Sequence, residues 1–516
     1  MEVEEENVKK MEMEIIRMLR HKEGEVEALR LLELVDDIDR LGLGYEFEEF
    51  INKSLQRLQS SQILIDNIND LHVSALYFRL LRQHGRHIST DIFERFKDSN
   101  KRFMESLSMD RRGMLSLYEA SYLAFDGENI LDETREFTRF HLNNMSTSAD
   151  VDKKFGERVR HALELPSHHR MPRLEARWNI EMYDHKQNVT NQMLHKLAIL
   201  DFNKVQSLHQ LELQEMIRWW RGVGLVEKLS FARDRAMESF FWSVGMAFEP
   251  ELSKFRMELA KVVQLIIVLD DIYDVYGTPQ ELEQLTRAVE RWDINGVNHL
   301  PYYMKLFFLA LYNTVNEMAY DTLKDQNHLV VYQLKEVWAD LCKSFLREAK
   351  WIHYKREIPK FDEYLNNGLI SSSGVVLLTH AFFFITPTVT DEAIESLNDG
   401  HASLRSSGTI FRLANDLISS KEDNLQAVSC YMHETGLCDE EVARAYVKEL
   451  IDHNWKLLNK EITYDAIFSK NFIRTCCNLA RIALCQYQDG DDHSAPSDGS
   501  RNRVKSVIVD PIQLIK

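Results

Sequence analysis

Three aspartates follow an apolar run in the second half of the chain, at a spacing that could bind metal. Leu265–Leu269 leads directly into Asp270 and Asp271, and Asp274 comes one helical turn after Asp270. Residues four apart share one face of a helix, where two like charges repel each other. A divalent cation would relieve this repulsion, and carboxylates without a His or Cys partner favour Mg²⁺, or Mn²⁺ in its place, over zinc. The competing interpretation is an exposed acidic helix end.

A second set of oxygen donors lies further along the chain. Asn415 and Ser419 are four residues apart, and Glu422 and Asp423 follow them closely. On one helix face, an amide, a hydroxyl and one of the two carboxylates could hold another hard cation. Arg412 precedes Asn415 by about one turn on the same side. Taken alone, such a string is more often a surface feature.

Two arginines stand upstream of the aspartates. Arg233 and Arg235 flank Asp234, and a pair of guanidinium groups can bind a diphosphate bidentately. A surface salt-bridge pair is the simpler interpretation of this string by itself. The order of the three features along the chain favours an arginine- and metal-assisted diphosphate chemistry.

Composition predicts that long helices position these groups. The 516 residues include only 19 Gly and 9 Pro, and 44% are hydrophobic, which favours helices over a turn-rich β architecture. The length exceeds that of one ordinary domain, and longer, more apolar helices begin near residue 200. The net charge of −18 argues against a nucleic-acid partner, and implies that an anionic substrate would need metal ions or well-placed arginines.

Cysteines and the N-terminal sequence indicate an intracellular protein. The six cysteines show no CxxC spacing, as expected for reduced thiols. The first residues are acidic and resemble neither a signal peptide nor a transit peptide, so we expect a cytoplasmic location, or a plastid if an N-terminal segment is missing. Apolar runs such as Val262–Leu269 are too short to cross a bilayer, and no membrane insertion is expected.

Two further acidic runs are similar to the aspartate cluster. For Asp36-Asp37-Ile38-Asp39, we expect a solvated helix face. Asp489-Gly490-Asp491-Asp492 fits a DxDD pattern used for protonation-initiated cyclisation, but it lies in a Gly-containing stretch without an apolar helix. We therefore expect a mobile surface loop at this second run, one that could act as a lid.

With these motifs the chain resembles the plant class I terpene synthases. The three matching strings are Asp270-Asp271-Ile272-Tyr273-Asp274, Asn415-Asp416-Leu417-Ile418-Ser419 and Phe231-Ala232-Arg233-Asp234-Arg235. Stretches similar to the same family occur along nearly the whole chain, from 72–85 to 430–436.

The resemblance implies an all-α fold of two helical domains. Residues 1–200 would form a relict α-barrel, and residues 201–516 a catalytic, metal-binding helical bundle around an apolar cavity. Three Mg²⁺ ions are implied, with the first two on Asp270 and Asp274, and Asp271 in a supporting position. The third ion would lie on Asn415, Ser419 and either Glu422 or Asp423. Diphosphate-binding groups would be Arg233, Arg235 and Arg412.

The implied reaction is ionisation of an allylic diphosphate. Cations and guanidinium groups would stabilise the leaving diphosphate, and an apolar cavity would keep water from the carbocation. Trp242 is the aromatic wall candidate, with plain core packing as its alternative.

Departures from the family pattern guide the substrate prediction. Many relatives that cyclise geranyl diphosphate carry a tandem arginine and a Trp near the N-terminus, whereas the first Trp here is Trp178. The chain is also shorter after the second metal motif, which would weaken activity. We therefore expect geranyl diphosphate to give an acyclic monoterpene or its alcohol. The alternatives are a sesquiterpene synthase acting on farnesyl diphosphate and a weakly active relative.

Two other functions compete with this hypothesis. A chain-elongating prenyltransferase would carry a second DDxxD-like motif in place of residues 415–419, and this sequence does not. A helical interaction scaffold would not need two metal motifs and an arginine pair in this order. The expected enzyme is a monomer whose partner is its small-molecule substrate.

Overall fold

The chain forms helices that fall into two compact units. The computed structural model describes residues 2–20, 25–60, 69–146, 152–183, 188–354, 358–418, 425–488 and 497–514. Within these ranges the elements are helices, and the one β feature is an isolated bridge between Lys97 and Phe103. The all-α prediction is therefore confirmed. Unit 1 comprises 1–206, 459–465 and 510–516, and unit 2 comprises 207–458 and 466–509, whereas the sequence predicts a single division at about residue 200.

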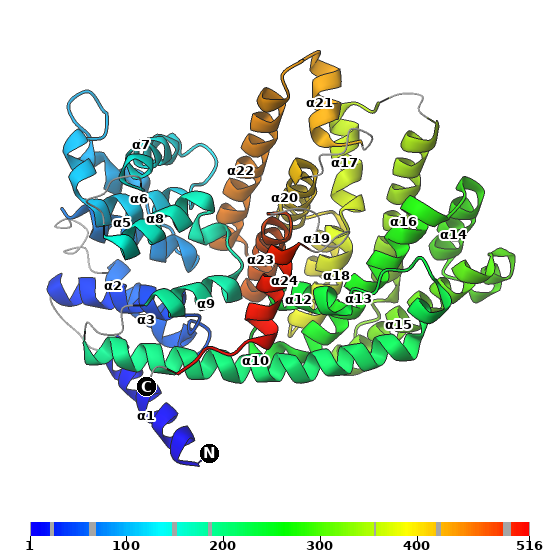
Figure 1. Ribbon diagram of the computed structural model, residues 1–516, viewed down its shortest axis with the longest axis horizontal. Coiled ribbons are helices and arrows are strands. Elements are labelled where there is room, and N and C mark those ends of the chain that lie inside the picture. The colour runs from blue at the N-terminus through cyan, green and yellow to red at the C-terminus, as the bar shows by residue number, and fades with distance from the viewer. Residues whose placement is uncertain are drawn as a thin grey trace. The chain divides into compact units, whose positions relative to one another are not determined.

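Unit 1 contains the helices labelled α1 to α9 in Figure 1, and they pack around one large apolar core. Its helices are α1 (Glu2–Arg20), α2 (Glu25–Arg40), α3 (Glu48–Ser60), α5 (Leu71–Gln83), α6 (Arg111–Ser121), α7 (Asn129–Ser146), α8 (Lys153–Glu164) and α9 (Pro172–Met182), with short 3₁₀ turns at Thr90–Phe96, Glu105–Met109 and Ser167–His169. Side-chain caps fix several helix starts: the Asp70 carboxylate, for example, accepts the backbone N–H of Val73 at the start of α5.

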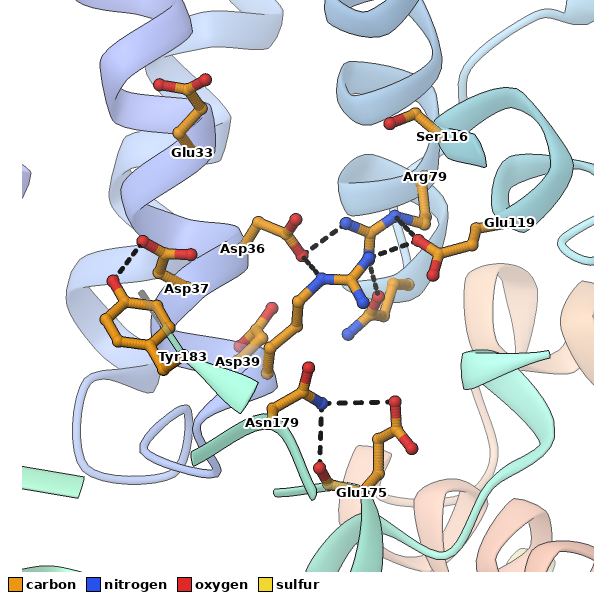
Figure 2. A network of polar contacts seen from close by, with 12 residues as sticks. Glu33, Asp36, Asp37, Asp39, Arg79, Ser116, Glu119, Glu175, Asn179 and Tyr183 are labelled. Atoms are coloured by element: carbon orange, nitrogen blue, oxygen red, sulfur yellow. Dashed lines mark hydrogen bonds and ion pairs between the residues drawn. The ribbon is translucent and has the colours of Figure 1, made fainter. Parts of the chain in front are cut away.

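The acidic run 36–39 of α2 takes part in a buried polar network of unit 1 (Figure 2). Asp36 accepts hydrogen bonds from Arg40, at 2.8 Å, and from Arg79 of α5. Both arginines also pair with Glu119 of α6. The predicted solvated helix face is therefore wrong, because α5 and α6 supply partners that the sequence of α2 alone does not reveal.

Two more carboxylates of the same run are paired with polar side chains. The Tyr183 hydroxyl donates to Asp37 at 2.6 Å (Figure 2). The Nε2 of His84 lies 2.8 Å from Asp39. Burial raises the pKa of Asp37 to about 6, against the opposing hydrogen bond from Tyr183.

Unit 2 is a helical bundle. Helix α10 (Val189–Val223) begins in unit 1 and continues into unit 2, and α22 (Glu440–Tyr464) ends in unit 1. The other helices are α11 (Leu225–Lys228), α12 (Ala236–Met246), α13 (Ser253–Asp271), α14 (Pro279–Arg291), α15 (Tyr302–Gln326), α16 (Val331–Tyr354), α17 (Phe361–Ser371), α18 (Gly374–Ile385), α19 (Asp391–Asn398), α20 (Ala402–Ile418), α21 (Ala427–Thr435), α23 (Lys470–Gln486) and α24 (Asp498–Val504). Shorter turns are the 3₁₀ helices Pro250–Leu252 and Ile294–His299 and the π-helices Ile272–Tyr276 and Lys505–Val509.

A ring of helices surrounds the centre of unit 2. Neighbours in this ring are α12 and α13, α13 and α18, α18 and α20, α20 and α23, and α23 and α12 (Figure 1). The second half of α13 is apolar nearly all round, as expected of a central helix, and its residues from Val262 to Leu269 are buried. The sequence thus places the aspartate cluster at the end of a buried helix.

The segment 361–385 is long and apolar enough, by length and composition, to cross a membrane. Its mean hydropathy reaches 1.8, and 72% of the apolar window is buried inside the protein. It comprises α17 and α18, both of which pack on α16 and α20. The sequence-based expectation rested on shorter runs such as Val262–Leu269 and did not include this segment.

Glycines let α17, α18 and α20 approach closely. A Cβ on Gly374 would lie 3.2 Å from the Cα of Gly408. A Cβ on Gly368 would lie 2.9 Å from the Cγ of Arg412, so the missing side chain makes room for this arginine.

Candidate active site

One cavity in unit 2 gathers most of the predicted residues that the structure describes. Its volume is about 310 Å³. Its polar lining comprises Arg233, Asp270, Asp274, Glu348, Ser371, Ser372, Ser373, Arg412, Asn415, Asp416 and Gln426. Its apolar and aromatic lining comprises Trp242, Val263, Ile266, Ile267, Phe345, Ile352, Leu377, Phe411, Leu425 and Tyr487. A charged rim above an apolar interior suits a ligand with one anionic and one hydrocarbon end.

Three carboxylates from three elements meet at the cavity. Asp270 lies in the last turn of α13, Asp274 lies in the π-helix that follows it, and Glu348 comes from α16. Desolvation, together with the like charges of Asp270 and Glu348, raises the pKa of Asp274 above its usual value, although the side chain keeps access to solvent. This excess of negative charge and hard oxygen donors fits a divalent cation such as Mg²⁺.

Asp271 holds the arginine segment in place. Its two carboxylate oxygens accept hydrogen bonds from the backbone N–H of Arg233 at 2.9 Å and from the Arg233 Nε at 2.6 Å. The Nη2 of Arg233 extends further, to Asp270 at 2.6 Å. Asp271 is 5% exposed and points to Arg233, as the supporting position implied by the resemblance would require.

A buried network fixes Arg412. Its guanidinium contacts Asp416 at 3.1 Å, Glu348 at 3.3 Å and the Tyr364 hydroxyl. Tyr364, fully buried in α17, also donates to both carboxylate oxygens of Asp416, at 3.0 and 2.9 Å. Asp416 further accepts the backbone N–H of Ala427, where α21 begins. Arg412 is thereby held at the cavity rim with little rotamer freedom.

Aromatic side chains form part of the apolar wall. Trp242 of α12 is 1% exposed, lines the cavity and packs on Phe411, with ring centroids 5.1 Å apart. Phe411 also lies near Tyr487, which directly follows α23, with ring centroids 6.1 Å apart. The structure therefore places Trp242 where the wall hypothesis requires.

Not every predicted site residue lines this cavity. Arg235 precedes α12, and its guanidinium reaches the backbone oxygen of Asp234 at 3.5 Å. Ser419, Glu422 and Asp423 lie outside the described residues, as does the predicted lid region around Asp489. Asn415 lines the cavity at the end of α20, directly before the part of the second motif that is not described.

Sequence reasoning missed Glu348 and Tyr364. Each is one polar residue on an amphipathic helix, a pattern that many surface positions share. Glu348 faces Asp274, and Tyr364 contacts Arg412. These contacts give both residues their role at the site, and only the packing of α16 and α17 against their neighbours reveals them.

Together these groups can separate charge in an allylic diphosphate. The carboxylates would hold cations, the cations and two arginines would stabilise a leaving diphosphate, and the apolar wall would exclude water from the hydrocarbon part.

Comparison with known proteins supports this description. The terpene synthase N-terminal domain matches residues 1–163, and the metal binding domain of the terpene synthase family matches residues 221–457. The chloroplastic isoprene synthase of Populus tremuloides is 49% identical over 518 residues, covering 99% of this chain and 86% of its own. The chloroplastic myrcene synthase of Quercus ilex is 46% identical over 510 residues, covering 98% and 84%.

Solved structures show the same fold. The isoprene synthase of grey poplar, in complex with three Mg²⁺ ions and dimethylallyl-S-thiolodiphosphate, superposes with a TM-score of 0.94 at 48% identity and covers 99% of this chain and 98% of its own. A limonene synthase with 2-fluorolinalyl diphosphate gives a TM-score of 0.93 at 38% identity, covering 98% and 94%. The chain thus belongs to the terpene synthase family, as the sequence resemblance predicts, and is a lyase of the class that acts on allylic diphosphates.

Proposed function

We propose that this enzyme is a Mg²⁺-dependent terpene synthase that ionises geranyl diphosphate and releases diphosphate with an acyclic monoterpene or its alcohol. The observation that supports this most is the single cavity in which Asp270, Asp274 and Glu348 face Arg233 and Arg412 above apolar walls. No side chain at this cavity needs to act as a nucleophile, because ionisation requires only stabilisation of the leaving group.

The donor set fits Mg²⁺. Asp270 and Asp274 would hold the first ions, with the Glu348 carboxylate facing them, and Asn415 would begin the ligand set of a third. When bound, the ions neutralise the charge that develops on the diphosphate. Three ions are proposed by analogy with the grey poplar isoprene synthase, and Mn²⁺ is the expected substitute.

Cavity size favours a short hydrocarbon chain. Ligand cavities commonly range from about 300 to 1,000 Å³, and the 310 Å³ found here is at the small end. This favours a ten-carbon geranyl chain over the fifteen-carbon farnesyl chain of the sesquiterpene alternative. Dimethylallyl diphosphate is a second candidate substrate, favoured by the 49% identity to isoprene synthases.

We also propose that this enzyme is located in the plastid. Several relatives, among them the isoprene and myrcene synthases, are chloroplastic proteins, and the comparisons give no support to the cytoplasmic expectation. We keep the monomer and the absence of membrane insertion as predictions, which gel filtration and membrane fractionation of the expressed protein would check.

Diphosphate release from geranyl diphosphate tests the metal site. With Mg²⁺ present, Asp270→Ala should lower kcat/KM by roughly a hundredfold or more, because a ligand of the leaving-group cations is lost. Thermal stability should stay close to that of the parent, since Asp270 is partly exposed and the loss of its ion pair with Arg233 is offset by less repulsion of Asp274. The matched control is Asp325→Ala, an exposed carboxylate of α15 paired with Lys254, which should keep full activity. Equal activity in parent and Asp270→Ala would contradict the proposal.

A further inference from the structure

Three aromatic rings connect the arginine segment to the metal-bearing turn. Phe231 stacks on Tyr276, with centroids 4.0 Å apart and planes at 16°. Tyr303 meets both rings edge-on, at 5.8 Å from Phe231 and 5.0 Å from Tyr276. We call these three residues the aromatic clasp.

The clasp joins the two segments close to their functional side chains. Phe231 lies two residues before Arg233, and Tyr276 lies two residues after Asp274. Tyr303, near the start of α15, donates its hydroxyl to Glu281 at 3.2 Å. Glu281 is itself fixed in the capping box with Thr278 that begins α14. The clasp thus ties both segments to the ends of two helices.

The arginine segment depends on side-chain contacts for its position. Residues 229–235 lie between α11 and α12 and are not part of a helix. Besides the bonds of Arg233 with Asp270 and Asp271, the Gln264 amide donates to the backbone oxygen of Arg233 and the Trp220 indole donates to Asp234. When a cation takes the Asp270 carboxylate and a diphosphate takes the Arg233 Nη2, the link between these two side chains must break. The clasp uses no group that binds a ligand, and can stay intact through this exchange.

Packing alone does not explain the clasp. Tyr276 is 52% exposed, so its ring buries only part of its apolar surface, while Phe231 and Tyr303 are half-buried. The three rings stand outside the cavity lining, which excludes direct contact with the hydrocarbon chain as their role.

We propose that Phe231, Tyr276 and Tyr303 form a positioning clasp, which keeps the arginine segment against the Asp270–Asp274 turn while Arg233 moves from Asp270 to the diphosphate. The proposal rests on the proposed function, since it requires Arg233 to bind diphosphate. It assigns the clasp an effect on diphosphate affinity rather than on the ionisation step.

Binding of inorganic diphosphate in the presence of Mg²⁺, measured by calorimetry on the full-length protein, tests the clasp. Phe231→Ala and Tyr276→Ala should each weaken binding roughly three- to tenfold, as expected from the loss of one aromatic pair. The double variant should bind diphosphate no more weakly than the weaker-binding of the two single variants, because either substitution alone already removes the stack. Phe231→Tyr should restore nearly full affinity.

Steady-state kinetics separates positioning from a general loss of structure. KM for geranyl diphosphate should rise in the same ratio as the dissociation constant, with kcat changed by less than about twofold. The control is Tyr320→Ala, which removes a 64% exposed ring from α15 and should leave both constants unchanged.

These measurements distinguish failure of the clasp proposal from failure of the proposed function. Unchanged affinity in Phe231→Ala, or losses that multiply in the double variant, would overturn the clasp while leaving the proposed function in place. A parallel loss in Tyr320→Ala would also overturn it. Failure of the parent protein to bind Mg²⁺ and diphosphate would instead contradict the proposed function, and the clasp with it.

Discussion

The adjacent residues Asp270 and Asp271 have different roles because the side chains of neighbouring helical residues point about 100° apart. Asp270 faces the cavity, whereas Asp271 turns to the arginine segment and accepts two hydrogen bonds from Arg233. The spacing of Asp270 and Asp274 made their shared face predictable from the sequence. The role of Asp271 as an anchor was not predictable from spacing, because it depends on where residues 229–235 pass.

Tyr364→Phe tests the network that holds Arg412. The change removes one hydroxyl that contacts both Arg412 and Asp416, and leaves a buried carboxylate with fewer donors. We expect a loss of about 1–2 kcal/mol in unfolding free energy and a severalfold higher KM for geranyl diphosphate. Thermal unfolding and steady-state kinetics measure the two effects. A lower stability with unchanged KM would show that Tyr364 supports the fold alone.

Asp37→Asn tests the buried run of α2. The Asp37 carboxyl has a pKa of about 6 in the folded protein, above the ordinary value of 3.8. Between these two pH values the folded protein keeps Asp37 protonated, whereas the unfolded chain has lost this proton. Stability therefore falls as pH rises from about 4 to 6 and stays lower above. The Asn variant cannot ionise and should be more stable than the parent at pH 8, on the order of 2 kcal/mol, with about half of this difference already present at pH 5.

Thermal unfolding at the two pH values measures this difference. Asp91→Asn, at an exposed position of unit 1, serves as the matched control and should show no such growth from pH 5 to pH 8. A parent more stable than Asp37→Asn at pH 8 would contradict the explanation, since it would mean that the charged carboxylate stabilises the fold.

At the scale of elements, the sequence predicted where helices form but not which other elements pack against them. The apolar run before Asp270 identified a buried helix, and α13 is one. The acidic run 36–39 was misassigned to solvent because its partners, among them Arg79 and Tyr183, come from distant parts of the chain. Glu348 was missed for the same reason, since its partners Arg412 of α20 and Ser371 of α17 are far from it in the sequence.

Gly368→Ala tests the close approach of α17 and α20. Alanine within a helix favours the helix by up to about 1 kcal/mol, but its Cβ would come within 2.9 Å of Arg412 Cγ. Because the Arg412 guanidinium is fixed by three partners, the side chain must shift from the cavity rim. We expect kcat/KM to fall roughly tenfold or more while the melting temperature changes by only a few degrees. Full activity in this variant would show that Arg412 has room to move.

For the whole molecule, the family and the all-α architecture were predictable because motifs recur along the entire chain. A net charge of −18 does not exclude an anionic substrate, since the cavity combines carboxylates suited to cations with two arginines. Substrate length was not predictable from the motifs, because it depends on the volume that side chains of six helices and their connections leave free. That volume, about 310 Å³, is the structural basis of the geranyl proposal.

The ratio of kcat/KM values for geranyl, dimethylallyl and farnesyl diphosphate, measured with Mg²⁺ and with product identification, tests the central claim most directly. The account predicts the highest value for geranyl diphosphate, an acyclic ten-carbon product, and loss of turnover when a chelator removes Mg²⁺. A higher kcat/KM for dimethylallyl diphosphate with a five-carbon product, or turnover that persists in the chelator, would contradict it.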